Sequence, residues 1–289
     1  MSRGSGLCSR AALVALALGF VVAAAVPAAP LSVLAPDSVA IRYAVTGSGE
    51  PALVFVHCWC CDRSYWKDQV PYFAKTHRVI TLDLAGHGES GMGRKEYTIQ
   101  SFGGDVAAVV NALDVKRVIL IGHSMGGEVS LEAARLLGDR VIGVIGVDTF
   151  QDFSERATPE QAEQFLGAFR ANFPGVTAQF VRSMFPASAD SALVTRVSED
   201  MAAEPAEVGI GAMKSLLGYD AKPTLAALTI PIRAVSSDKW PTNVEGNRAA
   251  AKSFEVRILP GHGHFLHMED PVDFNSALEE TIGKIVSGS

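Results

Sequence analysis

The chain is built from short, almost wholly apolar runs that alternate with helical patterns. β-Branched runs occupy 52–57, 78–83, 117–122, 141–148, 232–237 and 255–260, and 33–46 supplies one or two leading strands. A strand with one solvated face would alternate apolar and polar residues, whereas these runs are apolar nearly throughout. The pattern therefore predicts a doubly wound, mostly parallel sheet with helices on both faces, which is an α/β fold.

Helical periodicity fills the gaps between the runs. From Val106 to Leu113, apolar residues recur at i, i+3, i+4 and i+7, which predicts a helix with one buried stripe. A final helix is expected over 271–286. Asp270 is its predicted N-cap, and Pro271 stands at the first helical position, where a missing N–H costs nothing.

The alternation stops between 149 and 229, where no strand pattern occurs. We expect a helical cap at about 150–229, inserted into a single domain over 29–289. Its phenylalanines and methionines either line a pocket or simply pack the helices together. The expected cap helices are Pro159–Arg170, Val176–Met184, Asp190–Met201 and Glu207–Leu217.

The N-terminus is typical of a secretory signal peptide. A basic start is followed by an apolar run over 11–26 and by small residues with proline. That run is shorter than the ~20 residues of a membrane-spanning helix. We therefore expect residues 1–28 to be removed as a signal peptide, with cleavage at about residue 28, and the protein to be periplasmic or extracellular. Membrane attachment is expected only if the segment is retained. Cleavage would change the net charge from −6 to −8.

Charge and cysteine content exclude several classes of function. With 25 Lys+Arg against 31 Asp+Glu and no basic cluster, a nucleic-acid partner is not expected. Three cysteines follow the leader, Cys58, Cys60 and Cys61, and an odd number within four residues is not a disulfide framework. Buried free thiols are favoured, and a local disulfide is the alternative. We find no metal-ligand spacing and no phosphate-binding glycine loop, so neither a metal nor another cofactor is expected.

The strongest chemical signal is Gly-His-Ser-Met-Gly-Gly at 122–127, between an apolar run and a helical stripe. G-x-S-x-G at such a junction is typical of a nucleophile elbow, a sharp turn in which glycines avoid Cβ clashes. The turn would present Ser124 as a nucleophile at the carboxyl end of the sheet. The Met125 backbone N–H, next to it, is expected to donate to the oxyanion, and the second donor should come from the loop after 52–57.

A serine hydroxyl needs a base to remove its proton. His264 follows the last run in a loop that can reach the edge of the sheet, and His262 and His267 are nearby competitors. The base needs a carboxylate partner. We favour Asp238, which follows 232–237, and keep Asp148, which ends 141–148, as the alternative.

Together these pieces resemble the α/β-hydrolase fold superfamily, and within it the capped, esterase-like serine hydrolases. The resemblance runs from about residue 51 to 286. It implies Ser124 as nucleophile, Asp238 as acid and His264 as base, with oxyanion donors at Met125 and Trp59. The matching segments are His-Cys-Trp at 57–59, Asp-Leu-Ala-Gly-His-Gly-Glu-Ser at 83–90, Gly-His-Ser-Met-Gly-Gly at 122–127, Gly-His at 263–264 and Glu-Asp-Pro at 269–271.

One residue departs from the family pattern. Cys58 stands where the family usually has glycine, so a positive φ at this position would strain the turn or shift the donor.

The predicted function is hydrolysis of carboxylic esters through an acyl-enzyme on a small-molecule substrate. Ser124 at the elbow sets aside the related families that use an aspartate nucleophile. A lactonase, thioesterase, carbon–carbon bond hydrolase or perhydrolase would use the same triad and remains an alternative, as does a ligand-binding protein without turnover. Neither the oligomeric state nor the acyl preference follows from the sequence.

Overall fold

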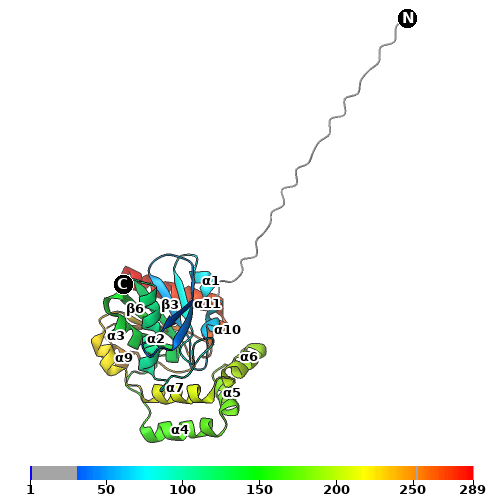
Figure 1. Ribbon diagram of the computed structural model, residues 1–289, viewed down its shortest axis with the longest axis vertical. Helices are drawn as coiled ribbons and strands as arrows, with labels where there is room; N and C mark the ends of the chain where they lie inside the picture. The colour runs from blue at the N-terminus through cyan, green and yellow to red at the C-terminus, as the bar shows by residue number, and fades with distance from the viewer. Residues whose placement is uncertain (2–30, 252, 289) are drawn as a thin grey trace.

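The computed structural model describes Met1, residues 31–251 and residues 253–288 (Figure 1). Apart from Met1, the expected signal peptide over 1–28 lies outside the described residues. Within the described part of the chain, no helix is both long and apolar enough to cross a membrane.

A mixed sheet forms the centre of the fold, with the strand order β1-β2-β4-β3-β5-β6-β7-β8. β1 and β2 pair antiparallel, as do β2 and β4, and every pairing from β4 to β8 is parallel. The predicted α/β fold with a mostly parallel sheet is therefore confirmed. The strands are β1 Leu31–Leu34, β2 Ala40–Thr46, β3 Ala52–Val56, β4 Val79–Leu82, β5 Val118–His123, β6 Val141–Val147, β7 Ile232–Ser237 and β8 Phe254–Leu259.

Both faces of the sheet are buried, as the apolar strands require. In β3, Val54 and Val56 face a core shared with α2 (Ile99–Ala112) and α3 (Met125–Leu137). Leu53 and Phe55 point the other way, into a core completed by α1 (Val70–Phe73) and α11 (Pro271–Ser287). Successive side chains of a strand point to opposite faces, so a run buried on both sides has no polar positions.

The last helix begins where the sequence predicts. The Asp270 carboxylate accepts hydrogen bonds from the backbone N–H groups of Val272 and Asp273, and Pro271 occupies the first turn. The cap satisfies two of the donors that a helix N-terminus leaves unpaired.

Between β6 and β7 the chain forms helices only. These helices are α4 Pro159–Ala171, α5 Phe173–Ser183, α6 Ser191–Ala202, α7 Ala206–Gly218 and α8 Lys222–Ala227. Figure 1 shows α4 to α7 gathered at one end of the molecule, beyond the sheet. The sequence did not predict α8 or α9 (Val244–Ala250), which are too short to show a helical period. Short helices also occur at η1 Arg63–Trp66, η2 Gly138–Arg140 and α10 Leu266–Glu269.

Candidate active site

Ser124 occupies the turn between β5 and α3, with φ 51° and ψ −123°. An L-residue rarely adopts a positive φ, and such strain persists only where the surroundings enforce it. The surroundings here are tightly packed. A Cβ on Gly122 would collide with the Gly126 carbonyl, and a Cβ on Gly126 would lie 2.5 Å from the Val56 carbonyl oxygen. Both glycines of the motif are therefore required by close backbone contact, which also brings the start of α3 against the end of β3.

His264 is held at both its side chain and its backbone. Its Nδ1 lies 2.6 Å from Asp148 Oδ2. Its backbone N–H donates to the Met184 carbonyl at 3.0 Å, and its carbonyl accepts from His123 Nε2 at 2.8 Å. With Nδ1 engaged by a carboxylate, Nε2 is the nitrogen that remains to act on a substrate or on Ser124.

Asp148 is buried at the end of β6, with φ 45°. While Oδ2 contacts His264, Oδ1 accepts two hydrogen bonds from Ser237, one from the backbone N–H and one from the hydroxyl, each at 2.8 Å. Hydrogen bonds to both oxygens fix the plane of the carboxylate. Asp148 can therefore orient the imidazole and stabilise its protonated form.

The preference for Asp238 as the acid is wrong, and the alternative, Asp148, contacts the histidine. Asp238 is exposed, and its Oδ1 accepts from the Gly261 backbone N–H at 2.9 Å. Strand order alone does not decide this, because β6 lies next to β5, which carries the serine, while β7 lies next to β8, which precedes the histidine. The side chains decide it: Ser237 holds Asp148 Oδ1 and leaves Oδ2 facing His264, whereas Asp238 is turned to the Gly261 N–H. The chain order Ser124, Asp148, His264 is still serine, acid, base. A signal was present in the sequence, because Asp148 directly ends an uninterrupted apolar run.

Neither competing histidine contacts Asp148. His267 is fully buried, its ring centroid 4.7 Å from that of Trp66, and burial lowers its pKa to about 3. His262 is only partly buried and lies 3.9 Å from Asp273. The geometry therefore favours His264 among the three.

Both expected oxyanion donors have free backbone N–H groups. No hydrogen bond takes up the N–H of Met125, the first residue of α3, or that of Trp59 among the described residues. Trp59 and Ser124 line the same cavity. Assignment of these groups to an oxyanion site remains a prediction.

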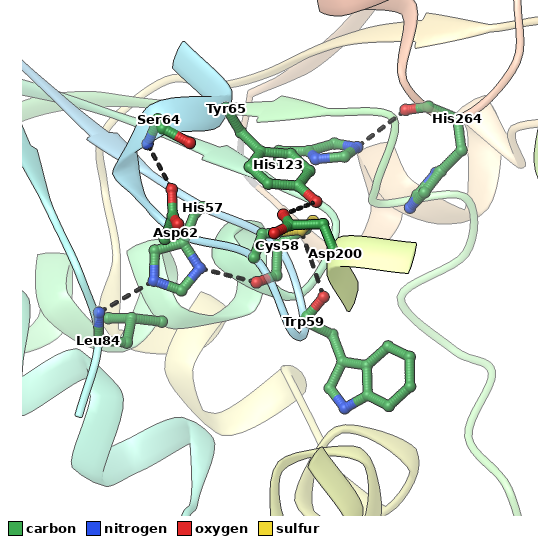
Figure 2. Close-up of a disulfide and its surroundings, with 11 residues drawn as sticks. His57, Cys58, Trp59, Asp62, Ser64, Tyr65, Leu84, His123, Asp200 and His264 are labelled. Atoms are coloured by element: carbon green, nitrogen blue, oxygen red, sulfur yellow. Dashed lines mark hydrogen bonds between the residues drawn. A yellow bond between two sulfur atoms is a disulfide. The ribbon is translucent and has the colours of Figure 1, made fainter. Parts of the chain in front are cut away.

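The expected strain at Cys58 does not occur, because the left-handed residue of this loop is Cys60, with φ 53°. Cys58 and Cys61 form a disulfide, and Cys60 is a buried free thiol whose pKa burial raises well above its usual range. The preference for three free thiols is thus wrong for two of them, and the local disulfide is the one the structure contains (Figure 2).

Two cavities meet at the serine and histidine. The first, of about 370 Å³, is mostly apolar; beside Ser124 and His264 it is lined by Cys58, Trp59, Phe165, Phe180, Ser183, Met184, Met201, Met213, Leu216, Leu217 and Trp240. Several cap phenylalanines and methionines therefore line a pocket, which is the first of the two alternatives stated from the sequence.

The second cavity, of about 600 Å³, is lined by polar and apolar groups in similar measure and also reaches Ser124 and His264. Besides Asp148, three further acidic residues line it, Glu128, Asp152 and Glu155. Burial raises the pKa of Glu128 to about 7, while hydrogen bonds from Ser154 and Asn243 lower that of Asp152. At neutral pH this cavity is therefore negatively charged. Among the described residues, no cluster of His, Cys, Asp or Glu could hold a metal ion.

The fold and the geometry of this site are those of α/β hydrolases, and the comparisons with known proteins agree. The model of the Alpha/beta hydrolase family matches residues 53–277, so the chain belongs to that family. It is a hydrolase of the α/β fold.

The proteins that the chain resembles include an enol-lactonase in sequence and an esterase in fold. The chain is 28% identical over 253 residues to 3-oxoadipate enol-lactonase 2 of Acinetobacter baylyi, covering 85% of this chain and 94% of the relative. Its fold resembles a thermophilic esterase from Thermogutta terrifontis, with TM-score 0.77, 24% identity and coverage of 89% and 99%. It also resembles the enol-lactonase from Burkholderia xenovorans LB400, with TM-score 0.73, 20% identity and coverage of 89% and 100%.

Proposed function

We propose that the protein is a serine hydrolase of neutral carboxylic esters or lactones, with Ser124, His264 and Asp148 as its triad. The observation that carries the proposal is the 2.6 Å contact between Asp148 Oδ2 and His264 Nδ1, next to a serine held at a positive φ in the same cavity. A buried carboxylate on one imidazole nitrogen makes the other nitrogen a general base.

The proposed reaction proceeds in two halves. His264 Nε2 takes the Ser124 proton as the serine oxygen attacks the carbonyl carbon, and the Met125 and Trp59 N–H groups stabilise the oxyanion. The imidazolium then gives its proton to the leaving alkoxide, which departs as the alcohol. Water repeats the sequence on the acyl-enzyme and releases the acid. Asp148 keeps its negative charge throughout and stabilises the imidazolium.

The two cavities suggest which substrates fit. An apolar arm of the ester would occupy the 370 Å³ cavity below the cap, and a polar arm the 600 Å³ cavity. An anionic group would meet Glu128, Asp152 and Glu155 in the second cavity, so neutral substrates are favoured.

A lactone is the second candidate substrate, favoured by the similarity to an enol-lactonase along most of both chains. The same triad opens a lactone, but the leaving alcohol then stays attached to the acyl group. Because both reactions pass through the same triad and an acyl-enzyme, the site does not distinguish the two substrate classes, and the relative rates on them do.

The test is a substrate panel with a matched pair of proteins. The parent enzyme and Ser124→Ala are assayed on p-nitrophenyl esters of increasing acyl length, on neutral lactones, on thioesters and on a carboxylate-bearing ester. We expect turnover of neutral esters or lactones by the parent, loss of at least about a thousandfold in Ser124→Ala, and fluorophosphonate labelling at Ser124 only. Turnover by Ser124→Ala near the parent rate would refute the proposal.

We further propose that the enzyme acts outside the cytoplasm. The proposal rests on the leader pattern over 1–28 and on the Cys58–Cys61 disulfide, since disulfides persist in oxidising compartments. N-terminal sequencing of the protein recovered from the periplasm or medium tests it. A mature N-terminus near residue 28 supports export, and an intact leader on cytoplasmic protein contradicts it.

A further inference from the structure

We propose that the Cys58–Cys61 disulfide is a positioning element for catalysis, which fixes the turn that presents the Trp59 N–H to the oxyanion. The proposal rests on the proposed function, because it needs a reaction that develops negative charge at Ser124. The disulfide lies in the loop between β3 and η1 (Figure 2). Its first cysteine lines the apolar cavity together with Ser124.

The disulfide connects the two ends of a four-residue turn. The Cys61 N–H donates to the Cys58 carbonyl at 3.3 Å, and the Cα atoms of these two residues are 5.3 Å apart. The third residue of the turn, Cys60, has φ 53°, a conformation that costs an L-residue about 1–2 kcal/mol. A turn with this cost and no glycine would relax without a constraint. The covalent link between its ends supplies one.

Hydrogen bonds hold the two ends of the turn in place. On the strand side, His57 Nδ1 lies 2.8 Å from the Cys58 carbonyl oxygen, and His57 Nε2 accepts from the Leu84 N–H at 2.9 Å. Burial lowers the pKa of His57, which keeps the ring neutral with Nδ1 as donor. On the other side, the Asp62 carboxylate accepts from the Ser64 N–H at 2.6 Å. Figure 2 shows these contacts on either side of the turn.

The side chain of the donor residue is held separately, by the cap. Trp59 Nε1 donates to the Gly209 carbonyl of α7 at 2.7 Å, and its ring meets Phe169, Phe173 and Phe180 edge-on. The indole therefore stays in place whether or not the sulfurs are linked. What the disulfide adds is the orientation of the peptide groups in the turn, including the Trp59 N–H, which no other described residue binds.

The remaining thiol does not compete for this linkage. Cys60 is buried, and the raised pKa keeps it protonated, whereas disulfide exchange requires a thiolate. The pair Cys58–Cys61 is thus the one that an external reductant acts on. A phosphine opens it with one water molecule: the S–S bond breaks, phosphorus is oxidised to phosphine oxide, and the two sulfurs become thiols with the protons of that water.

The experiment compares three proteins and two redox states. Steady-state kinetics are measured on the best ester of the panel, for the parent before and after phosphine treatment, for Cys58→Ser/Cys61→Ser, and for Cys60→Ala. Cys60→Ala is the matched control, because it removes a thiol from the same turn and leaves the disulfide. Thiol counting by mass spectrometry verifies each state.

We expect reduction and the double serine variant each to lower kcat by about ten- to a hundredfold, since removal of an oxyanion donor costs roughly 10²–10³ and displacement costs less. KM should change less than about threefold, reoxidation should restore kcat, and Cys60→Ala should match the parent.

Other outcomes would overturn the proposal. If the verified reduced enzyme keeps the parent kcat, the disulfide does not position the donor. If circular dichroism shows that reduction unfolds the protein at every temperature tested, the disulfide stabilises the whole fold and has no specific role in positioning the donor. If the oxidised parent neither turns over the panel nor reacts with the fluorophosphonate, the proposed function itself fails, which is distinguishable from both.

Discussion

Asp148 Oδ2 lies 2.6 Å from His264 Nδ1, although the two residues are 116 positions apart in the sequence. The carboxylate ends one strand of the sheet, and the imidazole follows another. The other carboxylate oxygen of Asp148 accepts from Ser237, at the end of β7, the strand between these two. The contact thus depends on three adjacent strands keeping their register, and it makes Asp148 the residue whose loss should damage the proposed reaction most selectively.

Asp148→Asn should lower kcat by about 10³–10⁴, because an amide neither stabilises the imidazolium nor selects the productive tautomer. The matched control is Asp238→Asn, which alters an exposed carboxylate bonded to Gly261. Its kcat should stay within about twofold of the parent. Kinetics on one ester decide between them, and the reverse ranking would restore Asp238 as the acid.

Gly126→Ala should disrupt the elbow, because its Cβ would lie 2.5 Å from the Val56 and 2.6 Å from the His57 carbonyl oxygen. We expect the free energy of unfolding to fall by about 1–3 kcal/mol and kcat to fall about a hundredfold as α3 is displaced. Gly167→Ala, within α4 and with open space around it, is the matched control. It should stabilise by about 0.5–1 kcal/mol. Urea denaturation measures both, and equal effects would contradict the packing argument.

Phe180→Ala should shift the acyl preference, because Phe180 lines the apolar cavity beside Ser124. Each additional buried methylene contributes about 0.8 kcal/mol, or roughly fourfold in kcat/KM, so the optimum should move to esters longer by two or three carbons. The measurement is kcat/KM along the p-nitrophenyl ester series. Leu136→Ala, on the exposed face of α3, should leave the profile unchanged. An unshifted profile in Phe180→Ala would exclude this cavity as the acyl site.

Acid should destabilise the protein below about pH 6.5 through its buried histidines. Burial lowers the pKa of both His87 and His267 to about 3, below the ordinary value of 6.5. Between those values the unfolded chain binds protons that the folded protein does not, so stability is complete above pH 6.5 and declines as the pH falls. Each such histidine contributes a slope of about 1.4 kcal/mol per pH unit.

His267→Gln should therefore reduce the pH dependence of stability between pH 4.5 and 6 by about one proton, whatever it does to stability at pH 7. The partly exposed His262, changed to Gln, is the control in the same loop. Urea unfolding across this pH range is the measurement. An unchanged slope in His267→Gln would show that this imidazole is already charged in the folded protein.

Local patterns in the sequence predicted most of the architecture. The apolar runs placed six strands of the sheet close to their observed bounds, the N-cap at Asp270 was identified from its neighbours, and G-x-S-x-G located the Ser124 turn. These features depend on interactions between residues near in sequence, or on burial on both faces of a strand, and both leave a mark on the residue order.

The site could be predicted only in part. The sequence singled out Ser124 and His264, but it offered two aspartates after two strands and left two readings of the cysteines. Choosing the acid required the side-chain contacts at the strand ends, because Asp148 faces His264 while Asp238 accepts from the Gly261 N–H. Choosing the cysteine pair required the turn, which brings the Cα atoms of the first and last cysteines to 5.3 Å from each other.

The residue order by itself thus determined a mostly parallel α/β sheet and the serine at its nucleophile turn. The tertiary structure alone decided that Asp148 contacts His264, that Cys58 pairs with Cys61, and that an apolar and an acidic cavity meet at Ser124. The disulfide depends on the conformation of one turn, whereas the triad contact and the meeting of the cavities depend on the distance between segments remote in the chain. That distance follows from strand adjacency and helix packing, which no local pattern encodes.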